Sequence, residues 1–183
     1  MTVDALLPLL LEDRAFYDNS GGGITLSGGE CLLQADFCAA LLKACKAAGL
    51  RTAVDTCGEV PRAAFDKVMP YTDRFLYDLK AIDEDIHIAA TGRSNRRILA
   101  NLRYIDACGK AFEVRYPFVP DYNADQAEKI AAFVKTLSHC VGVKVLPYHN
   151  LAGSKYAALG MKNTLPAALP TAAEVAAAQK LFE

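Results

Sequence analysis

The stretch GGGITLSGGECLLQ, residues 21–34, surrounds a short apolar segment with five glycines and then presents one carboxylate, Glu30. Glycine has no Cβ, so Gly28 and Gly29 allow a ligand to approach the backbone closely, although a glycine pair can equally form only a bend. The GGG at residues 21–23 has neither the GxGxxG spacing of a dinucleotide site nor the GKS or GKT ending of a P-loop. The stretch therefore predicts a strand that runs into an open turn, and not a nucleotide phosphate site.

The apolar periodicity on either side of this stretch switches between helical and strand-like, with glycine or proline at the switches. It predicts strands at residues 22–28, 51–58, 74–80, 111–119 and 142–149. It predicts helices at residues 2–17, 32–49, 61–71, 94–109, 123–140 and 171–183, with one more between 83 and a break near Gly92. Thr2 and Thr171 are the expected caps of the first and last helices, Pro8 is an expected weak point, and a loop precedes the last helix. This alternation indicates an α/β fold with a parallel sheet, in which a barrel and an open doubly wound sheet fit equally well.

Composition narrows the class of protein. The chain has 183 residues, 52% hydrophobic and 22% charged, as is typical of one globular domain with a substantial core. The formal net charge is −1 and the basic residues are scattered, so neither nucleic acid nor an anionic membrane is an expected partner. The longest apolar run, residues 5–11, is too short to span a bilayer and lacks the flanks of a signal peptide. We therefore expect a single domain, residues 1–183, in the cytoplasm.

The cysteines do not form a metal-binding or disulfide pattern that can be recognised from spacing. The six are Cys31, Cys38, Cys45, Cys57, Cys108 and Cys140. Nothing indicates secretion, so we expect reduced thiols that behave as small buried apolar side chains. The first three recur every seven residues, which places them on one face of a helix.

Polar residues follow each predicted strand at its carboxyl end. In chain order they are Ser27, Gly28, Gly29 and Glu30, then Asp55 and Thr56, Asp78 and Lys80, Arg115, and His149. The carboxyl ends of parallel strands lie on one face of a sheet, so these residues should converge on a rim although they are far apart in sequence. The alternative, that they only cap helices or lie in surface turns, would require the same coincidence at five strands.

The rim combines both signs of charge. Glu30 can accept from an ammonium group, and Lys80 can hold a carboxylate. The rim therefore suits a zwitterionic ligand such as an amino acid.

Six stretches of the chain, in order, match one known family. They are SGGGITLSGGECLLQ, DTCGEV, DLKAID, TGRSNRRILANL, EVRYPFVPDYN and LPYHNLAGSKYAALG. They resemble the activating enzymes of glycyl radical enzymes, which are radical S-adenosylmethionine (radical SAM) proteins, and most of all the pyruvate formate-lyase group. The resemblance runs from residue 2 to about residue 163. Each stretch alone is a weak signal, and together they are specific.

The resemblance implies a fold and a set of site residues. The family fold is a partial (β/α)6 barrel of the TIM-like type that binds S-adenosylmethionine at the strand carboxyl ends. Gly28, Gly29 and Glu30 would take the methionyl ammonium group, and Asp55, Lys80 and His149 would contact the amino-acid and ribose portions. Asp55, Thr56 and Asp78 resemble a monovalent cation site. Arg115 lies where the family lines the cofactor and the partner's glycyl loop.

The sequence departs from the family in one respect. The CxxxCxxC motif that binds the [4Fe-4S] cluster precedes, in the family, the point at which this sequence starts, and no cysteine here has that spacing. The first strand of the barrel precedes it too, so we expect strands 2 to 6 only. Without a cluster the chain alone is expected to be inactive, and we expect it to be part of a longer protein rather than a naturally short one.

Three functions follow as expectations. The first, by resemblance, is part of an activating enzyme whose full-length parent cleaves S-adenosylmethionine reductively and installs a glycyl radical on pyruvate formate-lyase or a relative. The resemblance also implies an electron donor such as flavodoxin and an anaerobic bacterial cytoplasm. The second is a cluster-free module that binds S-adenosylmethionine or a peptide without turnover. The third is an unrelated barrel lyase with Lys80 as a Schiff-base amine, which borohydride trapping would reveal.

An exposed sheet edge is a further expectation. Without a preceding strand, residues 24–26 would form an unpaired apolar edge, and such edges pair with other chains. We therefore expect an edge-strand dimer or poor solution behaviour.

Overall fold

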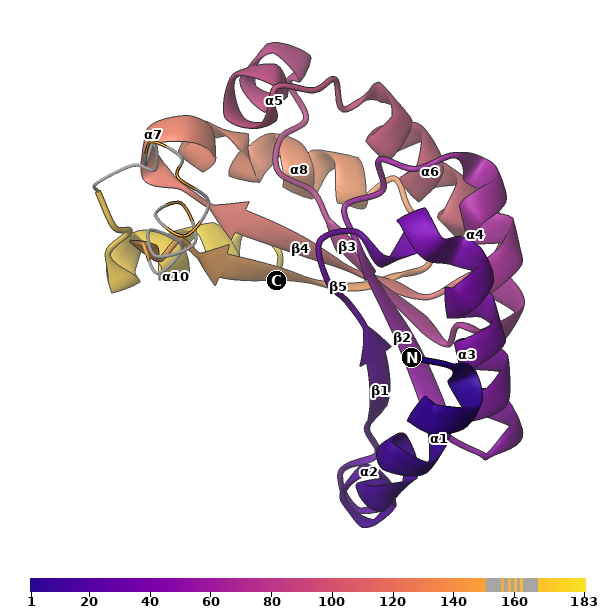
Figure 1. Cartoon of the computed structure of the whole chain (residues 1–183). Helices are drawn as coiled ribbons and strands as arrows, with labels where there is room; N and C mark the ends of the chain where they lie inside the picture. Colours follow the sequence, from indigo (N-terminus) through magenta and orange to yellow (C-terminus); the bar gives the residue numbers. More distant parts are fainter. Residues whose placement is uncertain (151–155, 157, 159, 161, 163–167) are drawn as a thin grey trace.

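The computed structural model describes residues 1–150, 156, 158, 160, 162 and 168–183. Five strands form one sheet in the order β1-β2-β3-β4-β5, and every neighbouring pair is parallel. Their bounds are β1 Gly23–Leu26, β2 Arg51–Thr56, β3 Arg74–Asp78, β4 Phe112–Phe118 and β5 Cys140–Pro147. The sheet curves, and α3, α4, α6 and α8 cover its outer side (Figure 1). The predicted parallel α/β sheet is confirmed.

Helices connect the strands. Their bounds are α1 Val3–Glu12, α2 Arg14–Ser20, α3 Ala35–Ala47, α4 Arg62–Val68, α5 Glu84–Thr91, α6 Arg96–Ala107, α7 Pro120–Asn123, α8 Ala127–Val134 and α10 Ala172–Lys180. Short 3-10 turns lie at η1 Cys31–Gln34, η2 Met69–Tyr71 and η3 Ala124–Gln126. The strand order never reverses along the chain, whereas a doubly wound sheet reverses at its switch point, so the arrangement is that of a barrel segment.

Burial alternates along each strand and separates two faces of the sheet. Thr52, Val54 and Thr56 are buried toward the helices, whereas Asp55 between the last two is half-buried on the inner face. The same alternation in β4 buries Val114 and Tyr116 and leaves Arg115 on the inner face. Because side chains alternate with a period of two, the helix-facing set builds the core and the other set is free to form a site.

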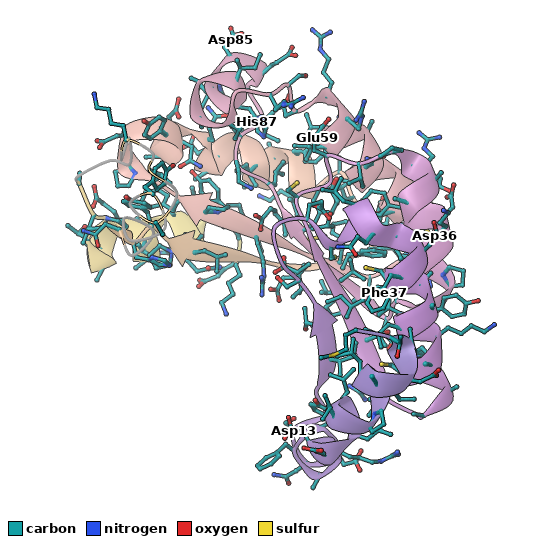
Figure 2. All side chains as sticks on the ribbon, in the orientation of Figure 1. Asp13, Asp36, Phe37, Glu59, Asp85 and His87 are labelled. Carbon is teal, nitrogen blue, oxygen red and sulfur yellow. The ribbon has the colours of Figure 1, made fainter. Side chains whose placement is uncertain are left out.

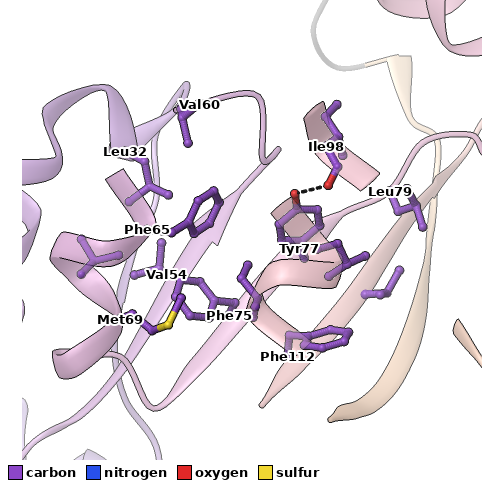
Figure 3. Close-up of a cluster of buried hydrophobic side chains, with 14 of the residues drawn as sticks. Leu32, Val54, Val60, Phe65, Met69, Phe75, Tyr77, Leu79, Ile98 and Phe112 are labelled. Atoms are coloured by element: carbon purple, nitrogen blue, oxygen red, sulfur yellow. Dashed lines mark hydrogen bonds between the residues drawn. The ribbon is translucent and has the colours of Figure 1, made fainter. Parts of the chain in front are cut away.

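The core lies between the sheet and the outer helices. Figure 3 shows its central part, where Phe65 of α4 packs against Phe75 and Tyr77 of β3 with ring centroids 5.8 and 6.4 Å apart. The Tyr77 hydroxyl is buried and donates to the Ile98 carbonyl of α6 at 2.7 Å, which satisfies its polar atom. These contacts fix α4 and α6 against the middle of the sheet.

Two helix predictions differ from the structure. The first helix ends at Glu12 and a second begins at Arg14, so the break falls at Asp13 (labelled in Figure 2) and not at Pro8, which lies inside α1. The helix predicted for residues 123–140 is interrupted: Asn123 ends α7, residues 124–126 form the 3-10 turn η3, and α8 spans only Ala127–Val134. The Asn123 and Gln126 side chains bond to neighbouring loops instead of pointing to solvent, and this replaces the first turn.

Both capping predictions are confirmed. Thr2 accepts from the Ala5 N–H at 3.3 Å, and Thr171 forms a capping box with Glu174 at the start of α10. The loop predicted before α10, and the part of the resemblance at residues 151–163, lie largely outside the described residues. Among the helices that are described, none is long and apolar enough to cross a membrane.

Candidate functional site

The carboxyl ends of the strands bring the predicted rim residues to one edge of the sheet. Asp78 of β3 stands directly opposite Arg115 of β4 in the register, and both side chains are half-buried. Asp55 of β2 is paired with Leu76 of β3, two residues before Asp78 on the same face. Three charged side chains from three strands therefore share the inner face.

Asp55 is the hub of this cluster. Its Oδ2 accepts from the Ser27 hydroxyl at 2.9 Å and pairs with Arg115 Nη1 at 3.1 Å. These contacts join the ends of β1, β2 and β4 through one carboxylate. Arg115 Nε is buried and has no hydrogen-bond partner among the described residues, so the guanidinium retains a donor for a further acceptor.

Lys80 forms a second ion pair beside the first. Its Nζ lies 2.9 Å from Asp78 Oδ2, and about a third of its side chain is exposed. Lys80 and Arg115 are thus each matched by a rim carboxylate, which leaves donors and acceptors at the surface of the inner face.

Glu30 is held by the protein more tightly than the sequence indicated. Its carboxylate accepts from the Thr56 hydroxyl at 2.9 Å, from the Cys57 N–H at 2.8 Å and from the Leu32 N–H at 3.1 Å. It caps the 3-10 turn η1 and ties the turn after β1 to the end of β2. Its predicted contact with a ligand ammonium stays a prediction, and only the remaining lone-pair capacity of this carboxylate could serve it.

Gly28 and Gly29 form an open turn directly after Ser27, whose hydroxyl bonds to Asp55. Gly28 has φ = 144°, and a Cβ at either glycine would meet no atom within 4 Å. Both line a groove of about 420 Å³ that runs along β1 to Phe37 of α3, which Figure 2 labels. The turn is therefore an open main-chain surface next to Ser27 and Glu30.

The predicted cation site is only partly assembled. Thr56 is buried on the helix side of β2, where its hydroxyl bonds to Glu30 and accepts from the Gly58 N–H at 3.0 Å, while Asp55 faces the other way. The hydroxyl of Thr56 therefore points away from the two carboxylates, Asp55 and Asp78. A monovalent cation site at these residues stays a prediction that depends on those carboxylates and on main-chain oxygens.

His149 lies just beyond β5 and is exposed. Its neighbour Tyr148 donates its N–H to the Phe118 carbonyl at 3.0 Å, which extends the β4–β5 pairing to the rim. His149 follows the carboxyl end of β5, and its predicted contact with a ribose stays a prediction.

One rim-facing charge was missed. Lys144 of β5 is the register partner of Arg115 and is exposed on the inner face. It lies in mid-strand, and only the register reveals that it stands beside Arg115. The strand-end rule used on the sequence could not select it.

The cysteines do not form a metal centre. Within the described ranges no three His, Cys, Asp or Glu side chains are grouped so that they could hold a metal ion. Burial raises the pKa of the Cys31 thiol to about 12, and it also raises the pKa of Cys38, Cys45, Cys57 and Cys140. The prediction of burial holds for Cys38 and Cys45 and is wrong for Cys108, which is exposed at the end of α6.

The donor set decides which cofactor the residues fit. Two cations, three carboxylates, an unpartnered Arg115 Nε and an open glycine turn match the ammonium and carboxylate of an amino-acid moiety, as S-adenosylmethionine carries. The described residues do not fit an iron–sulfur cluster, because no three thiols approach one another.

Comparison with known proteins agrees with this fit. The family model of the radical SAM superfamily matches residues 1–134. A trans-4-hydroxy-L-proline dehydratase activating enzyme from Clostridioides difficile is 40% identical over 85% of this chain and 53% of its own length. Pyruvate formate-lyase 1-activating enzyme from Escherichia coli K12 is 34% identical over 93% of this chain and 71% of its own.

A solved structure shares the fold. A domain of a pyruvate-formate lyase-activating enzyme from Bacteroides vulgatus superposes with a TM-score of 0.71 at 28% identity, covering 87% of this chain and 92% of that one. The chain spans about half the length of several curated relatives, 53% in the C. difficile case.

Proposed function

This chain belongs to the radical SAM superfamily and, within it, to the activating enzymes of glycyl radical enzymes, and we propose that it is the S-adenosylmethionine-holding part of such an enzyme. One observation carries the proposal. The Asp55–Arg115 and Asp78–Lys80 ion pairs meet on the inner face at the strand carboxyl ends, next to the open Gly28–Gly29 turn.

The chain's own residues would bind and orient the cofactor. Lys80 and the free donor of Arg115 would hold the methionyl carboxylate, and the main chain at Gly28 and Gly29 would face the ammonium group. Glu30 would keep that turn in place through Thr56 and Cys57, and His149 would approach the ribose. Reductive cleavage of the carbon–sulfur bond, leading to a radical on a glycine of the partner, is chemistry that the cofactor and cluster of the whole protein would supply.

The partners are part of the proposal. The client would be a glycyl radical enzyme, either pyruvate formate-lyase or one of the dehydratases and lyases named for the relatives. The electron donor would be a flavodoxin-like protein, and the setting an anaerobic bacterial cytoplasm. Residues 1–183 would act as one core domain containing strands 2 to 6 of the partial barrel, and a pair of β1 edges would form a dimer when nothing else covers them.

A cluster-free binding module is the second candidate. It is favoured by the rim, whose Asp78–Lys80 and Asp55–Arg115 ion pairs are complete within the described residues. This module would bind S-adenosylmethionine or a peptide without turnover, and only the first candidate predicts turnover.

Two measurements test the proposal. Titration calorimetry with S-adenosylmethionine should give an affinity that Lys80→Ala weakens about tenfold, the effect expected for one charge-assisted hydrogen bond. Lys46→Ala is the matched control, because Lys46 pairs with Asp73 at 2.7 Å at the other end of the sheet and should leave the affinity unchanged. Equal affinities for the unsubstituted protein, Lys80→Ala and Lys46→Ala would show that the rim does not bind S-adenosylmethionine through Lys80.

The second measurement separates the two candidates. The mass of the native protein in its source cells, with peptide mapping upstream of Met1, should exceed 19.7 kDa and include a CxxxCxxC peptide. A native species of 19.7 kDa would overturn the activating-enzyme proposal and leave the binding module as the proposed function.

A further inference from the structure

The segment after β3 is buried but belongs to no regular element. Residues 79–83 follow Asp78 and precede α5, and the side chains of Leu79 and Ala81 are fully buried. The Leu79 N–H still donates to the Arg115 carbonyl of β4 at 2.9 Å, but the peptide groups beyond it lie outside the sheet ladder, and leaving them unpaired would cost stability. The segment therefore needs partners from elsewhere.

Three buried side-chain amides provide those partners. We call Asn95, Asn123 and Gln126 the amide clasp; they are 1%, 3% and 0% exposed. Asn95 Nδ2 donates to the Ala81 and Ile82 carbonyls at 3.0 and 2.8 Å. Gln126 Oε1 accepts from the Ile82 and Asp83 N–H groups at 3.1 and 3.0 Å. The clasp thus replaces the missing secondary structure.

Asn123 holds the residue that carries the rim ammonium group. Its Nδ2 donates to the Lys80 carbonyl at 2.7 Å and to the Pro117 carbonyl at 2.8 Å, and its Oδ1 accepts from the Val119 N–H at 2.8 Å. Both amide hydrogens and the carbonyl oxygen are used. Asn123 therefore ties the main chain of Lys80 to the end of β4, the strand that carries Arg115.

The bond lies directly beneath a hollow at the rim. Lys80 and Asn123 both line a cavity of about 480 Å³ together with Pro117 and Tyr122. From the main chain that Asn123 holds, the Lys80 side chain extends to Asp78, where its Nζ forms the ion pair. A change at Asn123 would shift the main chain from which that side chain starts, without touching the ion pair itself.

We propose that Asn123, supported by Asn95 and Gln126, is a positioning residue that sets the location of the Lys80 ammonium group relative to Arg115. This rests on the proposed function insofar as Lys80 is taken to hold the cofactor's carboxylate. The geometric part, control of Lys80 by the clasp, stands independently of any cofactor.

A matched buried amide exists outside the clasp. Asn101 is also 3% exposed, and its Nδ2 donates to the Gly58 and Val60 carbonyls, both at 2.9 Å. It supports the loop after β2 as Asn123 supports the segment after β3. Its loss removes the same number of donated bonds and does not touch Lys80.

The test measures the reactivity of individual lysines by reductive methylation and mass spectrometry. Lys46, paired with Asp73, is the internal reference because its side chain is 38% exposed against 32% for Lys80. Asn123→Ser should raise the Lys80-to-Lys46 rate ratio about fivefold, as expected when a buried hydrogen bond that holds the ion pair is lost. Asn101→Ser should leave the ratio unchanged, because general loosening raises both rates.

An unchanged ratio in Asn123→Ser, or an equal rise in Asn101→Ser, would overturn the proposal. If Asn123→Ser does not fold, Asn95→Ser is used, and it should give a rise of about twofold because it releases only the residues after Lys80. No rise there would overturn the proposal as well.

Titration of S-adenosylmethionine into the same variants separates this proposal from the function. A raised ratio with weakened binding supports both. A raised ratio with unchanged binding supports the clasp and removes Lys80 from cofactor binding.

Discussion

The two edges of the sheet end in different ways. At β5, the side-chain amide of Gln179 of α10 forms the hydrogen bonds that a neighbouring strand would form. Its Oε1 accepts from the Val145 N–H and its Nε2 donates to the Val143 carbonyl, both at 2.9 Å. At β1, no strand among the described residues lies on the far side, and the groove along the strand is open.

The comparison shows how the unpaired N–H and carbonyl groups of an edge strand can be satisfied without another strand. One primary amide satisfies one donor and one acceptor of the edge. Ala178 of the same helix and Phe182, which follows the helix, cover the adjacent core, and the Phe182 ring centroid lies 6.3 Å from that of Tyr116. Among the described residues, the β1 edge is flanked by α2 and by the groove that Leu6 and Leu10 of α1 line, and neither helix has a buried residue. We expect substitutions to affect the two edges differently.

The largest difference should come from a glycine on each edge strand. A Cβ at Gly23 of β1 would lie 2.2 Å from the Arg51 carbonyl oxygen, whereas one at Gly142 of β5 would meet nothing within 4 Å. Gly23→Val should lower the free energy of unfolding by about 3 kcal/mol through overpacking, and Gly142→Val by less than about 0.5 kcal/mol. Urea unfolding of both variants measures this, and similar midpoints would contradict the described β1–β2 packing.

Removing the amide that closes β5 should have the next largest effect. Gln179→Leu leaves the Val145 N–H and the Val143 carbonyl without their partner, at a cost of about 2 kcal/mol in unfolding free energy. Lys180→Ala, on the exposed face of the same helix, is the control and should change stability little. Hydrogen exchange at the Val145 amide should accelerate in the first variant only; equal protection in both would mean that water replaces the amide.

Acid should weaken the side of the sheet near β1. Burial would raise the pKa of Asp73, but its bonds to Lys46 and Thr52 outweigh this and hold the pKa below the ordinary value of 3.8. The carboxylate therefore adds stability above pH 3.8, and this is lost as the pH falls through the lowered pKa.

Asp73→Asn tests that assignment. The side chain is 41% exposed, so screening limits its contribution, and we expect a loss of at most about 1 kcal/mol at pH 7 that disappears as the pH falls below 3.8 and through the lowered pKa. Asp36→Asn, which removes an exposed carboxylate paired with Lys67, is the control and should change the unfolding free energy at pH 7 little. A constant difference across pH would show that Asp73 acts through packing and not through charge.

A lysine on edge strand β1 should have the smallest effect on the free energy of unfolding but a clear effect on self-association of the protein. Thr25 of β1 is exposed, and Thr25→Lys should disturb edge pairing with another chain while changing unfolding by less than about 0.5 kcal/mol. Val141→Lys on β5 is the counterpart and should not alter association. Light scattering at high concentration should show self-association that only Thr25→Lys reduces; a monomer before substitution would rule out the edge dimer.

Much of the fold was accessible from sequence, because apolar periodicity and glycine positions report local structure. All five strands and the shared rim of Asp55, Asp78, Lys80 and Arg115 follow from that signal and from the geometry of parallel sheets. Helix ends were less accessible. The late start of α8 goes with the bonds of Asn123 and Gln126 to the segment after β3, which lies 43 and 44 positions away.

The parts that escaped prediction depend on side-chain direction. Asp55 and Thr56 were grouped in one cation site because they are adjacent in sequence. Adjacent residues of a strand face opposite sides of the sheet, so only Asp55 faces the rim. Glu30 was taken for a free acceptor because Thr56 and Cys57, its partners, are remote in sequence. Asn123 and Gln126 read as helix-forming or turn residues, and nothing local shows that their amides bind another loop.

The order of the strands in space is also the order in which a ribosome makes them. Each strand of a nascent chain therefore finds its neighbour already synthesised, and the sheet can grow during translation by short steps. The exception is the closure of β5, which waits for Gln179, 34 positions after Val145. A translational pause in that interval would leave a newly made strand exposed to other nascent chains.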